Sequence, residues 1–146
     1  MGKDRVYISL PMKGHEDTVK ERYDKACEYL NKVYDKYYPD IELEIVAPGN
    51  IDDFTEDGYV GNERKSWEWY IGEDTKILLT CNGIYMTDGW KNSKGCKVEL
   101  AIASQHCKKL FGLKDKDGNE VIYDSKLCKD LGKVLETGIY EQNKVI

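Results

Sequence analysis

The chain has 146 residues and a net charge of −5, a length that suits one domain with a buried core. Hydrophobic residues make up 40% and charged residues 34%, as in ordinary globular proteins. Without a general basic excess, binding to a nucleic-acid duplex is not expected. No apolar run approaches the roughly 20 residues that cross a bilayer, and the start lacks signal-peptide features, so we expect a cytoplasmic protein with no membrane partner.

The cysteines argue against a metal centre. There are five, an odd number, with no CxxC pair and no metal-ligand spacing to the two histidines. We therefore expect no metal and no cofactor, and reduced, mostly buried thiols.

The first part of the chain predicts a β–α–β unit. Residues 5–10 form a β-rich run that is closed by Pro11 and Gly14. A helical period starts at Asp17 and stops before Pro39, and residues 41–50 read as a second strand. Such a unit implies a parallel strand pair with a right-handed crossover. The apolar positions of this helix are Val19, Tyr23, Cys27, Leu30, Tyr34 and Tyr37.

The rest of the chain continues the alternation of strands and helices. We expect, in chain order, a surface loop (52–62), a helix (63–79) with an αL stop at Asn82-Gly83, a strand (84–87), a helix (93–108), a short strand in "KKLFGL", a turn at Asp117-Gly118, a strand in "EVIYD" and a final helix (125–137). The pattern predicts one three-layer α/β domain over residues 1–146, with a possible hairpin insertion at 112–125.

Three loops are expected to meet where ligands bind in open parallel sheets, beyond the carboxyl ends of the strands. Lys13 and Gly14 follow the first strand, and Ser93 and Gly95 stand at the start of the helix after the third. A lysine and a serine at a helix start suit a phosphate. The alternatives to phosphate binding are that Ser93 only caps the helix and that Lys13 is a solvated surface charge. No GxGxxG or GxxxxGK motif is present, which argues against Rossmann dinucleotide binding and a P-loop.

Glu99 is the most informative residue of this region. It lies in the small and aliphatic run "KNSKGCKVELAIA" and shares a helical face with Gly95, which leaves a gap beside the carboxylate. A buried carboxylate is costly and needs partners or a purpose; a salt bridge to a neighbouring helix is the alternative. Asp74 in the preceding helix and Tyr7 in the first strand are candidates for the same edge, although Tyr7 could also be an ordinary strand tyrosine.

Several motifs together resemble the nucleoside 2-deoxyribosyltransferase-like superfamily over roughly residues 5 to 112. They are "YISLPMKG" at the start, "ED" in a helix shortly before a "CN" step, and "GW.NSKGCKVELAIA". The resemblance is nearest to the small phage and bacterial branch, close to the 2′-deoxynucleoside 5′-monophosphate N-glycosidases. It implies a flavodoxin-like, doubly wound parallel sheet and chemistry at the N-glycosidic bond of a nucleoside or nucleotide.

The resemblance also implies roles for individual residues. Glu99 matches the glutamate that attacks the anomeric carbon, Asp74 the aspartate that assists the leaving base, and Tyr7 the tyrosine that positions nucleophile and sugar. Ser93 takes the place of an aspartate found in transferases that use free nucleosides. With Lys13, it favours a nucleoside 5′-monophosphate.

Further candidate substrate-binding residues come from the same loops. Ser9 and Gly14 belong to the first, and Asp88, Trp90 and Gly95 to the third. Trp90 is equally suited to stack on a base or to cap the core. Two departures from the superfamily stand out: Asn82 replaces an aspartate, which we expect to matter for the fold, and Leu10-Pro11 replaces Gly-Ser, removing a hydroxyl suited to phosphate.

We therefore expect an enzyme that cleaves or transfers at the N-glycosidic bond of a (deoxy)nucleoside 5′-monophosphate, as a homo-oligomer of two or more copies. The alternative is a non-catalytic protein that senses or sequesters a signalling nucleotide. A protein-interaction module, based on the 11 tyrosines and three tryptophans, is a third option.

Overall fold

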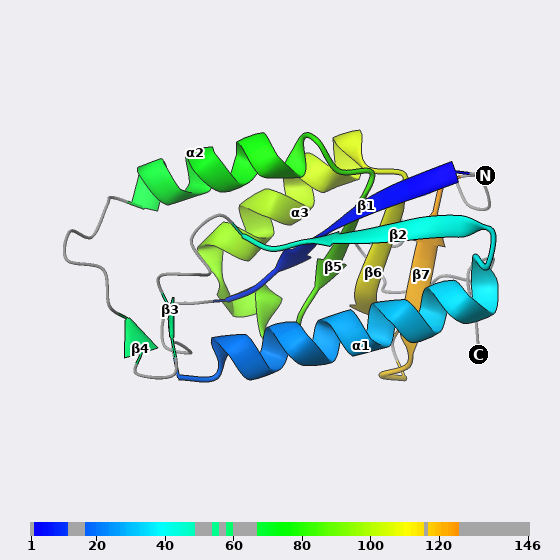
Figure 1. Cartoon of the computed structure of the whole chain (residues 1–146). Coiled ribbons are helices and arrows are strands. Elements are labelled where there is room, and N and C mark those ends of the chain that lie inside the picture. Colours follow the sequence, from blue (N-terminus) through cyan, green and yellow to red (C-terminus); the bar gives the residue numbers. More distant parts are fainter. Residues whose placement is uncertain are drawn as a thin grey trace.

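The computed structural model describes residues 2–11, 17–48, 54–55, 58–59, 67–115 and 117–125. Five of its strands form one sheet in the order β2-β1-β5-β6-β7 (Figure 1). Their bounds are β1 (Gly2–Ser9), β2 (Ile41–Val46), β5 (Gly83–Met86), β6 (Lys109–Lys114) and β7 (Glu120–Asp124). The predicted α/β class is confirmed.

The sheet is mostly, but not wholly, parallel. β1 pairs in parallel with β2 and β5, and β5 pairs in parallel with β6. β7 runs antiparallel to β6, which corrects the expectation of a wholly parallel sheet. The physical reason is the short connection from 115 to 119, because a parallel return requires a crossover of a dozen residues or more.

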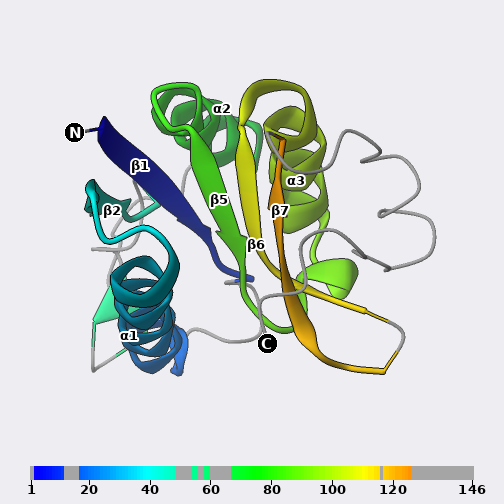
Figure 2. The same cartoon turned by 90° about the vertical axis from the view of Figure 1, so that its right-hand side faces the viewer.

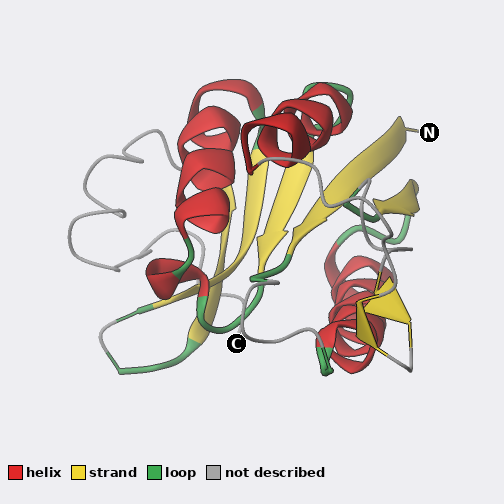
Figure 3. Cartoon of the chain, turned by 90° about the vertical axis from the view of Figure 1, so that its left-hand side faces the viewer, coloured by secondary structure: helices red, strands yellow, loops and turns green. Residues whose placement is uncertain are grey.

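Helices lie on both faces of this sheet. α1 (Val19–Tyr37) covers one face, and α2 (Trp67–Leu78) and α3 (Lys94–His106) cover the other, as the side views show (Figures 2 and 3). A 3-10 turn, η2 (Trp90–Asn92), precedes α3. The helix expected at 125–137 lies outside the described residues, apart from Ser125.

The alternating pattern of β1 divides the core into two clusters. Val6 and Ile8 pack with Leu30 of α1 on one face. Tyr7 packs with Leu100 of α3 on the other. Successive strand residues point to opposite faces, so Ser9 lies on the same face as Tyr7. This arrangement brings two hydroxyl-bearing residues of one strand toward α3.

α1 forms where its periodicity predicts it. Its buried positions are Val19, Ala26, Leu30, Val33 and Tyr34. Its last helical residue is Tyr37, two before Pro39, which cannot continue a helix. Among the expected apolar positions, Tyr23 and Tyr37 are only partly buried at the edge of the core.

Two local expectations are wrong. Within the described residues, positive φ angles occur only at Gly89, Gly112 and Gly118, so Asn82-Gly83 is not an αL stop. Asn82 instead uses its side chain, accepting from the Arg5 N–H and donating to Asp4, both at 2.7 Å. The segment expected as a surface loop, 52–62, contains an antiparallel pair, β3 (Phe54–Thr55) and β4 (Gly58–Tyr59).

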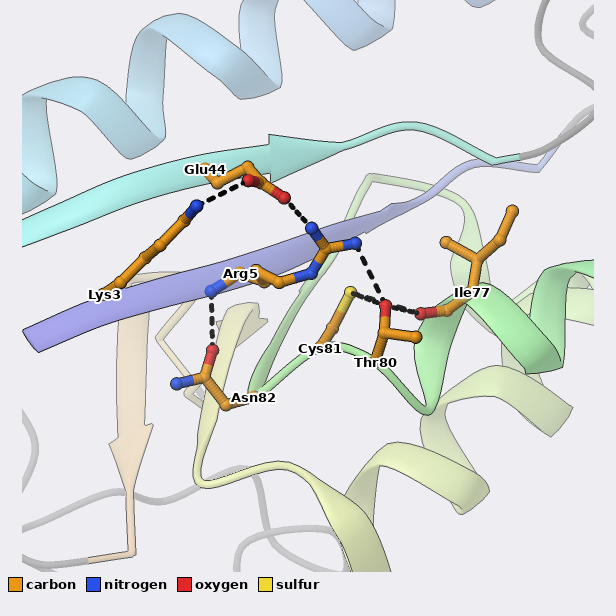
Figure 4. A network of polar contacts seen from close by, with 7 residues as sticks. All are labelled: Lys3, Arg5, Glu44, Ile77, Thr80, Cys81 and Asn82. Carbon is orange, nitrogen blue, oxygen red and sulfur yellow. Dashed lines mark hydrogen bonds and ion pairs between the residues drawn. The ribbon is translucent and has the colours of Figure 1, made fainter.

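A polar network joins β1, β2 and the end of α2 (Figure 4). Glu44 pairs with Lys3 at 2.9 Å and also with Arg5. The Arg5 guanidinium donates to the Thr80 hydroxyl at 3.0 Å, and that hydroxyl donates to the carbonyl of Ile77 at 2.6 Å. Because these contacts hold the amino-terminal half of β1, they position the strand that carries Tyr7 and Ser9.

No helix in the described part of the chain is both long and apolar enough to span a membrane.

Candidate functional site

Glu99 is buried and bonded to two hydroxyl groups of β1. It belongs to the buried stripe of α3, with Cys96, Leu100 and Ala103, and is only 4% exposed. The Tyr7 hydroxyl donates to Glu99 Oε2 at 2.6 Å, and the Ser9 hydroxyl donates to Oε1 at 2.7 Å. Among the ion pairs between described residues, none involves Glu99. Within the described part of the chain, the carboxylate is thus held by neutral donors and forms no ion pair with a cation.

The position of this carboxylate follows from the topology. β1 and β5 are neighbours, with Ser9 opposite Met86 at their carboxyl ends. The chain leaves β1 toward β2 on one side, whereas β5 lies on the other, so the edge between β1 and β5 is a switch point of the strand order. Ligands of open α/β sheets bind at such points. The start of α3 lies at the same edge (Figure 1).

Burial has the largest effect on the pKa values of Glu99 and Tyr7. It raises the pKa of Glu99 to about 7. The hydrogen bonds from Tyr7 and Ser9 lower this pKa, whereas the negative charge of Asp74 raises it further. The pKa of Tyr7 is raised well above its ordinary value, first by burial and then by the charges of Glu99 and Asp74. A carboxyl group with such a pKa exchanges its proton near neutral pH.

Asp74 joins the site from α2. It is buried, with 8% exposure, and its charge acts on both Glu99 and Tyr7. Two carboxyl groups and a phenol, from two helices and one strand, therefore occupy one electrostatic neighbourhood. This is the convergence that the sequence predicts for Tyr7, Asp74 and Glu99.

Ser93 is the N-cap of α3, the simpler of its two predicted roles. Its side chain accepts from the Cys96 N–H at 3.2 Å. A capping oxygen keeps its own O–H as a donor, and the Ser93 side chain also forms a hydrogen bond with the Cys96 thiol. Gly95 follows in the first turn of α3 and is partly buried.

Asp88 and Trp90 lie at the rim of this edge. The Asp88 carboxylate is exposed and pairs with Lys114 at 2.9 Å, so β6 provides its partner. Trp90 is half-buried and packs against the core cluster of α3, which favours its predicted role as a cap on the core. The predicted phosphate contacts Lys13 and Gly14 lie outside the described residues.

Sequence reasoning missed two residues that the structure places at the same edge. Thr87 is buried, and its hydroxyl donates to the Ser9 carbonyl at 2.9 Å. Arg22 of α1 donates to the carbonyls of Pro11, at 3.1 Å, and of Asp88. One signal for Arg22 was available, because it is one of only three arginines in the chain, with Arg5 and Arg64, and arginine is preferred where a fixed fork of donors is needed.

The thiols and carboxylates of the described residues form no group of three or more that could hold a metal ion. Four cysteines lie in the described part as free thiols, namely Cys27, Cys81, Cys96 and Cys107.

The fold and the site define an α/β protein with a buried, hydroxyl-bonded carboxylate at the carboxyl edge of its sheet. The model of a protein family described as "Domain of unknown function (DUF4406)" matches residues 4–111, and the chain belongs to this family. The matched region contains Tyr7, Asp74 and Glu99, whereas β7 follows it. No curated protein and no solved structure matches the chain.

Proposed function

We propose that this protein cleaves the N-glycosidic bond of a (deoxy)nucleoside 5′-monophosphate, passing the sugar either to water or to a second base. The observation that carries the proposal is Glu99, a buried carboxylate bonded to Tyr7 and Ser9 at the carboxyl edge of the sheet. A buried carboxylate that, among the described residues, has no ion-pair partner raises the free energy of the folded state. Attack on an electron-poor anomeric carbon gives this group a chemical purpose.

The first step forms a bond from a Glu99 oxygen to C1′ and breaks the bond from C1′ to the base nitrogen. The bonding electrons leave with the base, and Asp74 donates a proton to it. In the second step, water or a second base attacks C1′, Glu99 leaves as a carboxylate, and Asp74 takes back a proton. Hydrolysis thus yields a free base and a (deoxy)ribose 5-phosphate, with Asp74 protonated as at the start.

The two acids are electrostatically coupled, because the negative charge of Asp74 raises the pKa of Glu99, so ionising both groups at once is unfavourable. Tyr7 and Ser9 donate to Glu99 and thereby favour its ionised form. The state with Glu99 charged and Asp74 protonated is the one that the first step needs.

The preference for a monophosphate rests on Ser93, which caps the start of α3, where the helix dipole attracts an anion. An aspartate at this position would repel a phosphate. The strand order agrees with the flavodoxin-like, doubly wound arrangement that is part of the proposal.

We also propose a homo-oligomer. Two large apolar side chains near or on α2 are exposed, Trp69 by 46% and Leu79 by 49%, and a second copy would cover them. Light scattering after size exclusion tests this, with a monomer at all concentrations as the contrary result.

A nucleotide panel tests the function. Purified protein is incubated with ribo- and deoxyribonucleoside 5′-monophosphates, with and without a free base, and the products are separated by chromatography. We expect base release from at least one monophosphate and loss of at least about 1,000-fold in rate for Glu99→Gln. A nucleotide that raises the melting temperature yet is recovered intact would instead establish the non-catalytic binding protein.

A further inference from the structure

Arg22 lies on α1, on the opposite side of the sheet from α3, yet its guanidinium reaches the ligand-binding edge. One nitrogen, Nη1, donates to the Pro11 carbonyl just after β1 at 3.1 Å. The other, Nη2, donates to the Asp88 carbonyl just after β5 and lies 3.5 Å from the Thr87 hydroxyl. A single side chain therefore bridges the two loops that flank the switch point.

The contacts of Arg22 continue to the candidate nucleophile. The Thr87 hydroxyl and N–H both donate to the Ser9 carbonyl, at 2.9 and 3.2 Å. Ser9 in turn donates its hydroxyl proton to Glu99. The guanidinium is thus held in a fixed position relative to Glu99 by Thr87 and Ser9.

The positive charge of Arg22 is not balanced by a carboxylate in the described part of the chain. Its acceptors are two carbonyls and a hydroxyl, all neutral. The nearby Asp88 carboxylate pairs with Lys114 instead. An arginine carries five N–H donors, more than these three contacts use. A half-buried cation with spare donors is suited to an anionic ligand.

The field of Arg22 reaches the first turn of α3. Burial has the largest effect on the Cys96 thiol and raises its pKa, whereas hydrogen bonds with Ser9 and Ser93 and the charge of Arg22 act in the lowering direction. The Cys96 N–H donates the N-cap hydrogen bond to the Ser93 side chain. Arg22 of α1 and Ser93 at the start of α3 thus both act on Cys96, in the first turn of α3.

We propose that Arg22 determines specificity for a 5′-phosphorylated substrate, by supplying the fixed cation that binds the phosphate beside the acids Glu99 and Asp74. This inference rests on the proposed function. A phosphate dianion near two carboxyl groups would be repelled without such a cation, whereas an uncharged nucleoside does not need it. Arg22 is therefore expected to discriminate between a monophosphate and the matching free nucleoside.

The test compares kcat/KM for one monophosphate and its free nucleoside in wild type, Arg22→Gln, Arg22→Lys and Lys25→Gln. Lys25 is the matched control, since it is an exposed cation of the same helix that pairs with Glu21. We expect Arg22→Gln to lower the monophosphate value roughly 10- to 100-fold through KM, with less than about 3-fold change for the nucleoside. Arg22→Lys keeps the positive charge but not the forked set of donors, so its kcat/KM for the monophosphate should lie between those of wild type and Arg22→Gln. Lys25→Gln should match wild type.

Equal losses for both substrates, with a lower melting temperature, would make Arg22 a structural clamp and overturn the inference. No loss for either substrate would overturn it as well. To separate folding from recognition, the dissociation constants of both ligands are also measured by calorimetry in the Glu99→Gln background with and without Arg22→Gln, where turnover is not needed. If wild type neither cleaves nor binds any nucleotide, the proposed function itself fails, an outcome distinct from loss of discrimination.

Discussion

At the scale of the residue, Glu99 links the stability of the fold to the proposed chemistry. The residue is only 4% exposed, and burial raises the pKa of its carboxyl from the ordinary 4.5 to about 7. A group whose pKa is raised by folding contributes stability below its unfolded pKa, and this contribution is lost as pH rises through the folded pKa. Glu99 therefore weakens the fold progressively between about pH 4.5 and 7, where the proposed nucleophile becomes ionised.

Glu99→Gln should stabilise the protein while removing base release. The amide has nearly the same shape and no charge to bury, so at pH 8 the free energy of unfolding should rise by up to about 3 kcal/mol, the value that a pKa change from 4.5 to about 7 represents. At pH 5 the difference should nearly vanish, because folded wild type is then protonated at Glu99. Urea unfolding at both pH values measures this. A destabilised Glu99→Gln at pH 8 would show a structural glutamate.

Tyr7→Phe should move the pH dependence of base release. The Tyr7 hydroxyl donates to Glu99 at 2.6 Å and lowers the pKa of that carboxyl against the effect of burial. Without this bond the pKa of Glu99 rises further, so the acidic limb of the kcat profile should shift to higher pH, and the rate at pH 7 should fall by roughly 10- to 100-fold. A profile that keeps its midpoint while falling in height would contradict the role of Tyr7.

Individual site residues differ in how far sequence alone identifies them. Glu99 stands out because a carboxylate in a small, apolar helical stripe violates the usual pattern, and Tyr7 and Asp74 follow from spacing and resemblance. Arg22 does not stand out, because a cation among Lys20, Glu21 and Asp24 reads as part of a solvated face. Its contacts with Pro11 and Asp88 at the sheet edge depend on the tertiary structure. The periodicity of the local sequence carries no information about them.

At the scale of the element, the strands and helices expected from the sequence are largely present because their patterns are strong. α1 and β1 follow clear periods of hydrophobic residues, and Pro39 marks the end of α1. The prediction for Asn82 is wrong because its role lies in its side chain. The Asn82 amide forms hydrogen bonds with Asp4 and Arg5, and the residue does not end a helix in the αL conformation. The antiparallel direction of β7 depends on the short turn at Gly118, whose φ is positive at 84°.

Gly112 in β6 is expected to be irreplaceable, in contrast to Gly118 in the turn. Both have positive φ angles, 80° and 84°, so an alanine is strained at either position. A Cβ on Gly112 would lie 2.1 Å from the Met86 carbonyl oxygen, whereas one on Gly118 meets nothing within 4 Å. Gly118→Ala should cost about 1 kcal/mol, and Gly112→Ala more than about 3 kcal/mol. Similar melting temperatures for the two variants would contradict this account.

At the scale of the whole molecule, a second buried polar cluster lies away from Glu99, near the start of β1. Asp4 pairs with Lys109 of β6 at 2.6 Å and accepts from Tyr34 and Asn82, both at 2.7 Å. Burial alone would raise the pKa of Asp4, but these hydrogen bonds and the charge of Lys109 lower it. Asp4 has a cation as a partner, whereas the described residues form no ion pair with Glu99 and bond it through neutral hydroxyls. We propose that the first cluster serves stability and the second the reaction.

Lys109→Met should therefore destabilise the fold by about 3 to 5 kcal/mol at pH 7, because Asp4 is left as an uncompensated buried charge. The double variant with Asp4→Asn should recover at least half of this loss. The lowered pKa of Asp4 contributes stability that is fully present above its ordinary pKa of 3.8 and is lost as the pH falls below that value. The difference in the free energy of unfolding between wild type and Lys109→Met should therefore narrow below about pH 3.8. A gap that does not depend on pH would show that packing, not charge, explains the loss.

The most direct test of the proposed chemistry is to trap the glycosyl-enzyme. The protein is mixed with a 2′-fluoro nucleoside 5′-monophosphate, whose electron-withdrawing substituent disfavours the oxocarbenium-like transition states, then quenched in acid and analysed by intact and peptide mass spectrometry. We predict a mass increase of one fluorinated sugar phosphate, located on Glu99 and missing in Glu99→Gln. Release of base by wild type with no adduct on Glu99, or with the same adduct in Glu99→Gln, would contradict the assignment of Glu99 as the nucleophile.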